Sequence, residues 1–256
     1  MEVHHHSHSH SNPAHGGTGK NWKQYLWEFL MLFLAVFCGF LAENFREQQL
    51  EHHRERQYMK SLTEDLARDI HQIEINQRLL NRFIGRLDSI ETDFNDLKDG
   101  TPSLVTIKQI HRGIGFPDFI YTDRTIQQLK NAGNMRLVRN LAVADSITEY
   151  DATVRRGMVH QDLVNQMSAQ KLADKIKNTI NIKLMNKLIA DNPNEGETNF
   201  ILKNILLVHD KTELIRFTNE VDDYKMMINV LLFFISQDKE MAQRLLIFIK
   251  KEYHLE

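Results

Sequence analysis

The feature that most constrains this chain is an unbroken run of fourteen apolar residues, at positions 29–42. Extending the run back to Tyr25 gives eighteen residues with a single charge, that of Glu28. A helix rises 1.5 Å per residue, so about 20 residues cross a hydrocarbon core of ~30 Å. The run therefore predicts one membrane-spanning helix, and we expect residues 20–44 to form a transmembrane anchor.

Two other interpretations of the apolar run are weaker. A cleavable signal peptide needs a small-x-small cleavage site, and residues 40–43 (FLAE) fit that pattern poorly. A buried core helix is the other alternative, but five Phe or Trp in the sixteen residues 27–42, with no polar face, fit lipid better. Trp22, Tyr25 and Trp27 gather at the amino end, where an aromatic belt is expected. We therefore favour a retained single-pass anchor that lies in the lipid bilayer.

Glu28 lies about one turn inside the predicted span. A carboxylate at the bilayer centre is costly, whereas one near an end can reach the headgroups. An interfacial glutamate is the favoured interpretation, and an ion or proton site in an oligomer is the alternative. Lysines and arginines nearly balance across the span, with Lys20 and Lys23 before it and Arg46, Arg54 and Arg56 after it. The positive-inside rule therefore leaves the orientation open.

Residues 1–19 form a separate, histidine-rich tail without an apolar period. Such a composition predicts disorder. Imidazole groups bind zinc, nickel or copper ions. The candidate ligands are His4, His5, His6, His8 and His10. A flexible tract does not fix a coordination geometry, so we expect weak and unselective binding. A cloning tag or a passive polar tail is the alternative.

Composition excludes several classes of protein. The chain has 32 Lys and Arg against 34 Asp and Glu, and this balance argues against a nucleic-acid partner. Eleven glycines and four prolines are too few for a β-sandwich or barrel rich in turns. The single cysteine excludes an intrachain disulfide and a multi-cysteine metal site. We expect an all-α chain with no cofactor.

The region after the span divides into a stalk and a bundle. Residues 45–60 are mostly polar, with seven charged residues and two histidines, and predict a solvated helical stalk. From Met59 to Phe94 apolar residues recur with a period of 3.5, which indicates a coiled-coil-like seam or one face of a long helix. We therefore expect a helical bundle domain over residues 61–256. The helices expected after residue 99 are 104–111, 122–130, roughly 141–191, 200–208, 212–236 and 238–253. One continuous helix over the last two ranges is the alternative. Residues 230–235 (VLLFFI) are too short to span a bilayer and are expected to be buried.

The most unusual local cluster comprises Gly133, Asn134, Arg136 and Arg139, which follow Asn131. Gly133 is well placed for a left-handed turn that ends a helix. Two arginines beside a helix start could hold an anion. The favoured alternative is a helix–turn–helix junction in which the arginines pair with acidic neighbours.

Three strings resemble a family of uncharacterised single-pass membrane proteins from Bacteroidota, a domain of unknown function. They are residues 25–44 (YLWEFLMLFLAVFCGFLAEN), residues 129–140 (LKNAGNMRLVRN) and residues 249–253 (IKKEY). The resemblance covers almost the whole chain. It implies a location in the bacterial inner membrane, with a cytoplasmic tail and the bulk of the chain in the periplasm. It implies no catalytic residue.

No familiar catalytic motif occurs in the sequence, and Cys38 lies in the apolar span, where a thiolate is disfavoured. We therefore expect a protein that is not an enzyme. The favoured hypothesis is a membrane-anchored helical bundle with a structural, scaffolding or protein-interaction role, as a homo-oligomer or with a membrane protein partner. The alternatives are a sensory or regulatory input subunit acting through a partner, and an oligomeric pore or ion-handling assembly that uses Glu28.

Overall fold

The computed structural model describes residues 22–131 and 133–255, and over these residues the fold is all-α, as predicted. The only β pairing among them is two isolated bridges. The chain divides into two compact units, residues 1–52 and residues 53–256, and each is described by itself. The elements are α1 (Trp22–Asn95), α2 (Leu104–His111), α3 (Arg124–Asn131), a 3₁₀ turn η1 (Asn134–Leu137), α4 (Leu141–Leu163), a π turn η2 (Val164–Ser168), α5 (Ala169–Thr179), α6 (Ile182–Ala190), α7 (Glu195–Lys203) and α8 (Lys211–Tyr253).

The first unit contains the amino-terminal part of α1, with the predicted apolar run. The helix there is long and apolar enough to cross a membrane, and none of that apolar stretch is buried. The rings of Phe29, Phe33 and Phe37 stack along one side of it, with neighbouring centroids 6.3 and 5.8 Å apart. By length, composition and position, the segment could be a membrane anchor or a signal sequence. The predicted histidine-rich tail, with its candidate metal ligands, lies outside the described residues.

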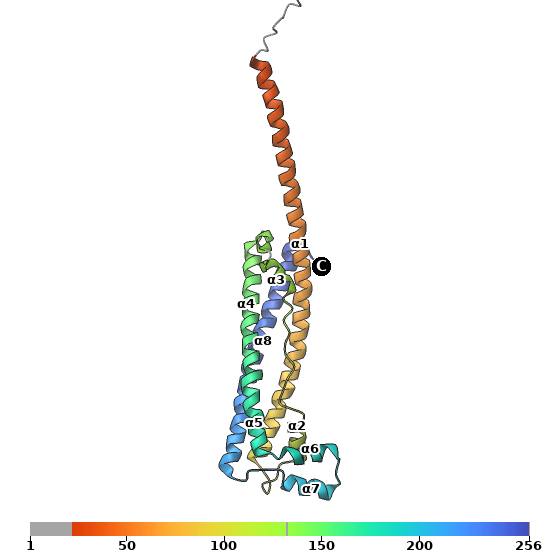
Figure 1. The fold of residues 1–256 in the computed structure, drawn as a ribbon, viewed down its shortest axis with the longest axis vertical. Helices are drawn as coiled ribbons and strands as arrows, with labels where there is room; N and C mark the ends of the chain where they lie inside the picture. Colours follow the sequence, from red (N-terminus) through yellow and green to blue (C-terminus); the bar gives the residue numbers. More distant parts are fainter. Residues whose placement is uncertain (1–21, 132, 256) are drawn as a thin grey trace, which may run out of the picture. The chain divides into compact units, whose positions relative to one another are not determined.

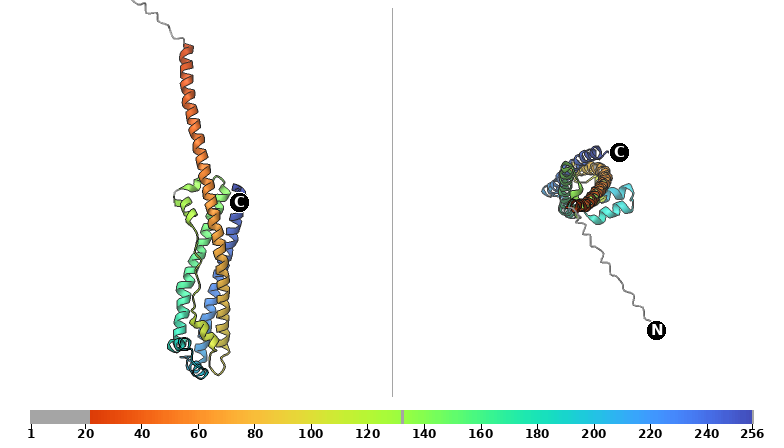
Figure 2. Two further views of the ribbon diagram at one scale, coloured as in Figure 1. Left: turned by 90° about the vertical axis from the view of Figure 1, so that its right-hand side faces the viewer. Right: turned by 90° about the horizontal axis from the view of Figure 1, so that it is seen from above.

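The second unit is built on long helices that run side by side: the rest of α1, then α4 with α5, and α8 (Figures 1 and 2). Buried residues of α8 alternate in steps of four and three, which is the 3.5-residue spacing of a coiled-coil seam. The buried positions of α1 follow the same alternation, as the sequence predicted. The α8 seam comprises Phe217, Val221, Tyr224, Ile228, Leu231, Ile235, Asp238, Ala242, Leu245 and Ile249. The α1 seam comprises Glu55, Met59, Leu62, Leu66, Asp69, Ile73, Asn76, Leu80, Phe83, Leu87, Ile90 and Phe94.

The helix expected over residues 141–191 is interrupted twice. At η2 a π turn inserts one extra residue, so the buried position that follows Ser168 is Leu172 instead of residue 171. At Ile180 the backbone becomes extended, and Asn181 caps the new helix α6. The backbone N–H of Asn181 donates to Ile205 O (2.8 Å), and that of Leu207 donates to Thr179 O (2.9 Å). The expectation of one helix was wrong because this short bridge competes with helical hydrogen bonding.

Two other expectations need correction. The helix expected over residues 200–208 is instead α7, which begins at Glu195 because the Asn194 side chain caps its first turn, and which ends at Lys203. Residues 230–235 are helical, but only Leu231 and Ile235 are buried, whereas Val230 and Phe233 are exposed. The segment is part of one continuous helix, α8, so it has a buried and an exposed face. The short helices α2, α6 and α7 gather at the end of this unit away from the C-terminus (Figures 1 and 2).

Candidate functional site

An extended segment, residues 113–123, runs through the second unit without forming a helix. Polar seam residues of the long helices satisfy its backbone. Gln161 of α4 accepts from the Phe119 N–H (2.9 Å) and donates to the Phe119 carbonyl (3.2 Å). Asn76 of α1 donates to the Asp118 carbonyl (3.2 Å), and the Tyr224 hydroxyl of α8 donates to the Ile114 carbonyl (2.7 Å). These buried polar groups therefore replace the partners that a strand would find in a sheet.

Two buried aspartates of α1 hold the end of this segment. Asp69 accepts from the Thr122 N–H (2.9 Å) and from the Tyr150 hydroxyl (2.8 Å). Burial raises the pKa of Asp69, and the hydrogen bonds from Thr122 and Tyr150 oppose that rise. Asp65 accepts from Arg124 Nε (2.7 Å) and from the Thr125 N–H (3.3 Å), so it caps the start of α3 from a different helix.

Asp151 of α4 is also buried, but it has cationic partners. It accepts from the Tyr121 hydroxyl (3.1 Å), from Arg155 Nε (3.1 Å) and from Lys130 Nζ. Burial alone would raise its pKa, but the hydrogen bonds from Lys130 and Arg155 outweigh burial and lower the pKa below its usual value. Burial raises the pKa of Tyr121, so the phenol stays a neutral donor. The group is a satisfied structural network.

Asp238 differs from these aspartates. It is 1% exposed and is the one ionisable carboxyl in the buried seam of α8. Its Oδ1 atom is buried and has no hydrogen-bond partner among the described residues. Gly157 of α4 lies opposite, and a Cβ atom there would stand 3.0 Å from Asp238 Oδ2. Burial raises the pKa of Asp238 to about 7, Arg156 opposes the rise and Asp69 adds to it. Asp238 therefore binds or releases a proton near neutral pH.

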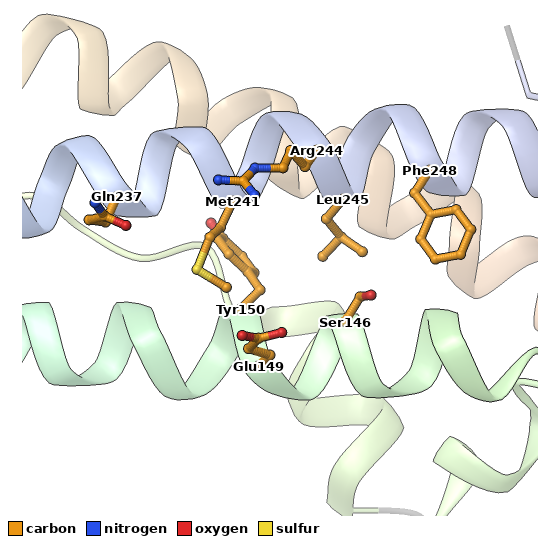
Figure 3. Close-up of a pocket in the computed structure, with 8 residues that line it drawn as sticks. All are labelled: Ser146, Glu149, Tyr150, Gln237, Met241, Arg244, Leu245 and Phe248. Atoms are coloured by element: carbon orange, nitrogen blue, oxygen red, sulfur yellow. The ribbon is translucent and has the colours of Figure 1, made fainter.

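A groove of about 430 Å³ opens between α4 and α8 (Figure 3). Glu149 of α4 and Arg244 of α8 lie on opposite walls, and the Met241 side chain points from α8 towards Tyr150. Arg244 also pairs with Glu240 on its own helix (2.5 Å). The remaining lining residues are Ser146, Gln237, Leu245 and Phe248. The groove thus offers one carboxylate, one guanidinium and an apolar floor.

The cluster at residues 133–139 forms the junction between α3 and α4. Gly133 has a φ of +63°, the left-handed conformation that its position predicted. Asn134 Nδ2 donates to the Tyr58 hydroxyl (3.0 Å). The Arg139 N–H donates to the buried carboxylate of Glu55 (2.8 Å), and Arg139 Nε lies 4.0 Å from it. Arg136 is exposed on η1.

The other predicted positions belong to the first unit. Glu28 and Cys38 are exposed on the apolar part of α1. Within residues 22–131 and 133–255, no group of three or more His, Cys, Asp or Glu side chains is arranged to hold a metal ion. Sequence reasoning overlooked Asp238, although its interruption of an apolar 3.5-residue pattern was a usable signal. Comparisons with protein-family models, with curated proteins and with solved structures found no match in any of the three.

Proposed function

We propose that this chain is a single-pass membrane protein whose helical bundle is a non-catalytic interaction module. The observation that carries the proposal is the contrast between the two units. The apolar stretch of α1 is exposed along its whole length, whereas the second unit buries a continuous apolar core of its own. Apolar surface of that extent is stabilised only by lipid or by another protein. Insertion in a bilayer accounts for it with the fewest additional partners.

The proposed role for the bundle follows from where its polar groups are used. The buried carboxylates Glu55, Asp65, Asp69 and Asp151 are each occupied by backbone or side-chain donors of the bundle itself. Their bonds hold the extended segment and the helix ends in place. Such a network supports a rigid scaffold that presents surfaces, and we expect the protein to act by binding other proteins at the membrane and not as an enzyme.

The anchor is tested by a charge placed in the span, with a matched control. Val36 is 73% exposed on α1 and Val105 is 61% exposed on α2. We expect Val36→Arg to release the chain from alkali-washed membranes, because an arginine near the bilayer centre costs about 3 kcal/mol. Val105→Arg should stay in the membrane fraction. Intact mass of the membrane-bound wild-type chain must include residues 22–42, and their removal would identify a signal sequence instead.

The resemblance noted above supports a finer proposal, that the protein lies in a bacterial inner membrane with its bundle in the periplasm. A carboxyl-terminal alkaline phosphatase fusion is expected to be active, and a fluorescent-protein fusion at the same position is expected to be dark. The reverse pair of results would place the bundle in the cytoplasm.

Purification from native membranes in mild detergent tests the interaction role. Retained partners or copies of the chain are expected, and a bare monomer would contradict this role.

A further inference from the structure

Helix α8 carries a second stripe with the same alternation of three and four residues as its buried seam. The stripe is exposed along its length and comprises Met226, Val230, Phe233, Gln237, Glu240, Arg244 and Ile247. Its first three members are apolar, and Phe233 is 61% exposed. A repeat of 3.5 residues keeps one face of a helix against a partner helix over several turns. The exposed stripe therefore has the periodicity of a helix-packing surface.

Helix α4 extends this surface on the same side. His160 Nε2 lies 3.2 Å from the Met227 carbonyl oxygen, and its ring centroid lies 5.3 Å from that of Phe234. These contacts bring the neighbouring exposed residues of α4, Val159 and Leu163, to the level of the apolar end of the stripe. Five exposed apolar side chains thus gather in what we term the outer patch: Val159, Leu163, Met226, Val230 and Phe233.

The other end of the same face is charged. Glu149 on α4 and Arg244 on α8 form opposite walls of the groove and so lie at one level along the bundle (Figure 3). The α4–α8 face therefore has an apolar end and a charged end, where Arg244 lies between Glu149 across the groove and Glu240, its ion-pair partner on α8 (2.5 Å). When two copies of this face meet in the same sense around a two-fold axis, α4 of each copy lies beside α8 of the other. Glu149 of each copy then lies opposite Arg244 of the other copy, which gives two ion pairs. The two outer patches cover each other.

The opposite arrangement is electrostatically poor. An antiparallel pairing of two such faces would place Glu149 and the Arg244–Glu240 pair against the outer patch. Glu149 would then be desolvated without a cationic partner from the other copy. The size of the face is also adequate. The stripe from Met226 to Ile247 is about 32 Å long, and a surface two helices wide covers roughly 600 Å² per copy. Two copies would bury about 1,200 Å² together, the lower bound for stable protein–protein interfaces.

We propose that the α4–α8 face is a homodimer interface in which two copies of this chain pair in parallel. The proposal rests on the proposed function, since it names the partner of the interaction module as a second copy. Membrane insertion would favour this pairing by raising the effective concentration of the two bundles. The groove between Glu149 and Arg244 is where the partner's charged side chains are received.

The test measures the mass of the full-length chain in lipid nanodiscs or mild detergent. We expect a dimer for the wild type and a monomer for Phe233→Glu, because the variant places two carboxylates in a covered apolar patch. The matched control is Phe200→Glu on α7, where Phe200 is 67% exposed away from this face. That variant should remain dimeric. A wild-type monomer, or a Phe233→Glu variant that is still dimeric, would overturn the proposal.

A charge exchange tests the parallel arrangement itself. Glu149→Arg should weaken the dimer about tenfold, because two attractive pairs become repulsive. Adding Arg244→Glu to that variant should restore most of the affinity, and failure of this rescue would contradict the parallel pairing. A wild-type monomer that stays in the membrane and retains a different protein would overturn the homodimer while leaving the proposed function intact.

Discussion

The hydroxyl of Tyr253 donates a 2.6 Å hydrogen bond to Glu55 Oε1, so the last turn of α8 is tied to α1 across 198 residues of sequence. Glu55 is 2% exposed and also accepts from the Arg139 N–H (2.8 Å). One buried carboxylate thus joins α1, the start of α4 and the end of α8. Burial raises the pKa of Tyr253, which keeps the phenol protonated as a donor.

Tyr253→Phe should destabilise the second unit by about 2 kcal/mol, because a hydrogen bond to a buried charged group is lost and the carboxylate keeps fewer donors. The measurement is urea unfolding followed by helical circular dichroism in mild detergent. The control is Tyr58→Phe, which removes one hydroxyl hydrogen bond to Asn134 at a half-buried site. That change should cost under about 1 kcal/mol. Equal effects of the two variants would show that Glu55 does not depend on Tyr253.

The second prediction concerns the pH dependence of stability. The pKa of the Asp238 carboxyl is about 7 in the folded chain and about 3.9 in an unfolded one. Between these values the folded state holds a proton that the unfolded state has lost. Stability is therefore highest below pH 4 for this group, falls by about 1.4 kcal/mol per pH unit up to pH 7, and is then level. The total loss is about 4 kcal/mol.

Asp238→Asn isolates this contribution, because Asp69 also has a raised pKa and remains in both proteins. We expect the difference in unfolding free energy between the variant and the wild type to grow in favour of the variant from pH 4 to pH 7. Unfolding at pH 4, 5, 6, 7 and 8 measures it. A difference that does not vary with pH would show that Asp238 stays ionised throughout.

The seam of the long helices could be predicted from the sequence, because the apolar residues from Met59 to Phe94 repeat every 3.5 residues whatever they pack against. The extended segment could not. Residues 113–123 hold Gly113, Gly115 and Pro117, a pattern typical of a surface loop. The burial of Phe119 within this segment depends on a distant polar side chain, that of Gln161. The interruption of the helix at Ile180 could not be predicted for a similar reason. Ile176, Ile180 and Leu184 continue a helical spacing, and only the cap at Asn181 marks the end.

The candidate site residues also differ in how far the sequence could predict their burial. In the sequence, Asp65 and Asp69 resemble surface residues, because the helix around them carries many charged side chains. No local pattern indicates that α3 and residue 122 lie against these two carboxylates. Asp238 was more accessible to prediction. It stands at a seam position between Ile235 and Ala242, where every neighbour in the pattern is apolar. A charge at such a position indicates a group that is buried with its ionisation disfavoured.

The third prediction tests the role of Gln161. Gln161→Leu leaves the N–H and the carbonyl of buried Phe119 without partners, which should cost about 2–4 kcal/mol. It should also raise amide hydrogen exchange selectively over residues 116–122. Asn165→Ala is the control, because Asn165 donates a hydrogen bond to the side chain of Asp118 in the same region and not to the backbone of Phe119. If the exchange of residues 116–122 is unchanged in Gln161→Leu, the segment is held by its apolar side chains alone.

The fourth prediction concerns two helical glycines that are alike in backbone but not in surroundings. Within the part of the chain that the structure describes, a Cβ atom at Gly85 would meet nothing within 4 Å. A Cβ atom at Gly157 would stand 3.0 Å from the Asp238 carboxylate and 3.6 Å from Phe234 Cβ. Gly85→Ala should therefore stabilise the second unit by about 0.5–1 kcal/mol. Gly157→Ala should instead destabilise it by about 1–2 kcal/mol, since the α4–α8 contact must open to admit the methyl group.

The physical cause is tested by a double-mutant cycle. In an Asp238→Ala background the carboxylate is gone, so Gly157→Ala should become neutral or stabilising, and the coupling energy between the two positions should be about 2 kcal/mol. Unfolding of the four proteins at pH 8, where Asp238 is ionised, measures it. A coupling energy near zero would mean that Gly157 is required by Phe234 or by backbone geometry. Asp238 would then not set the spacing of α4 and α8.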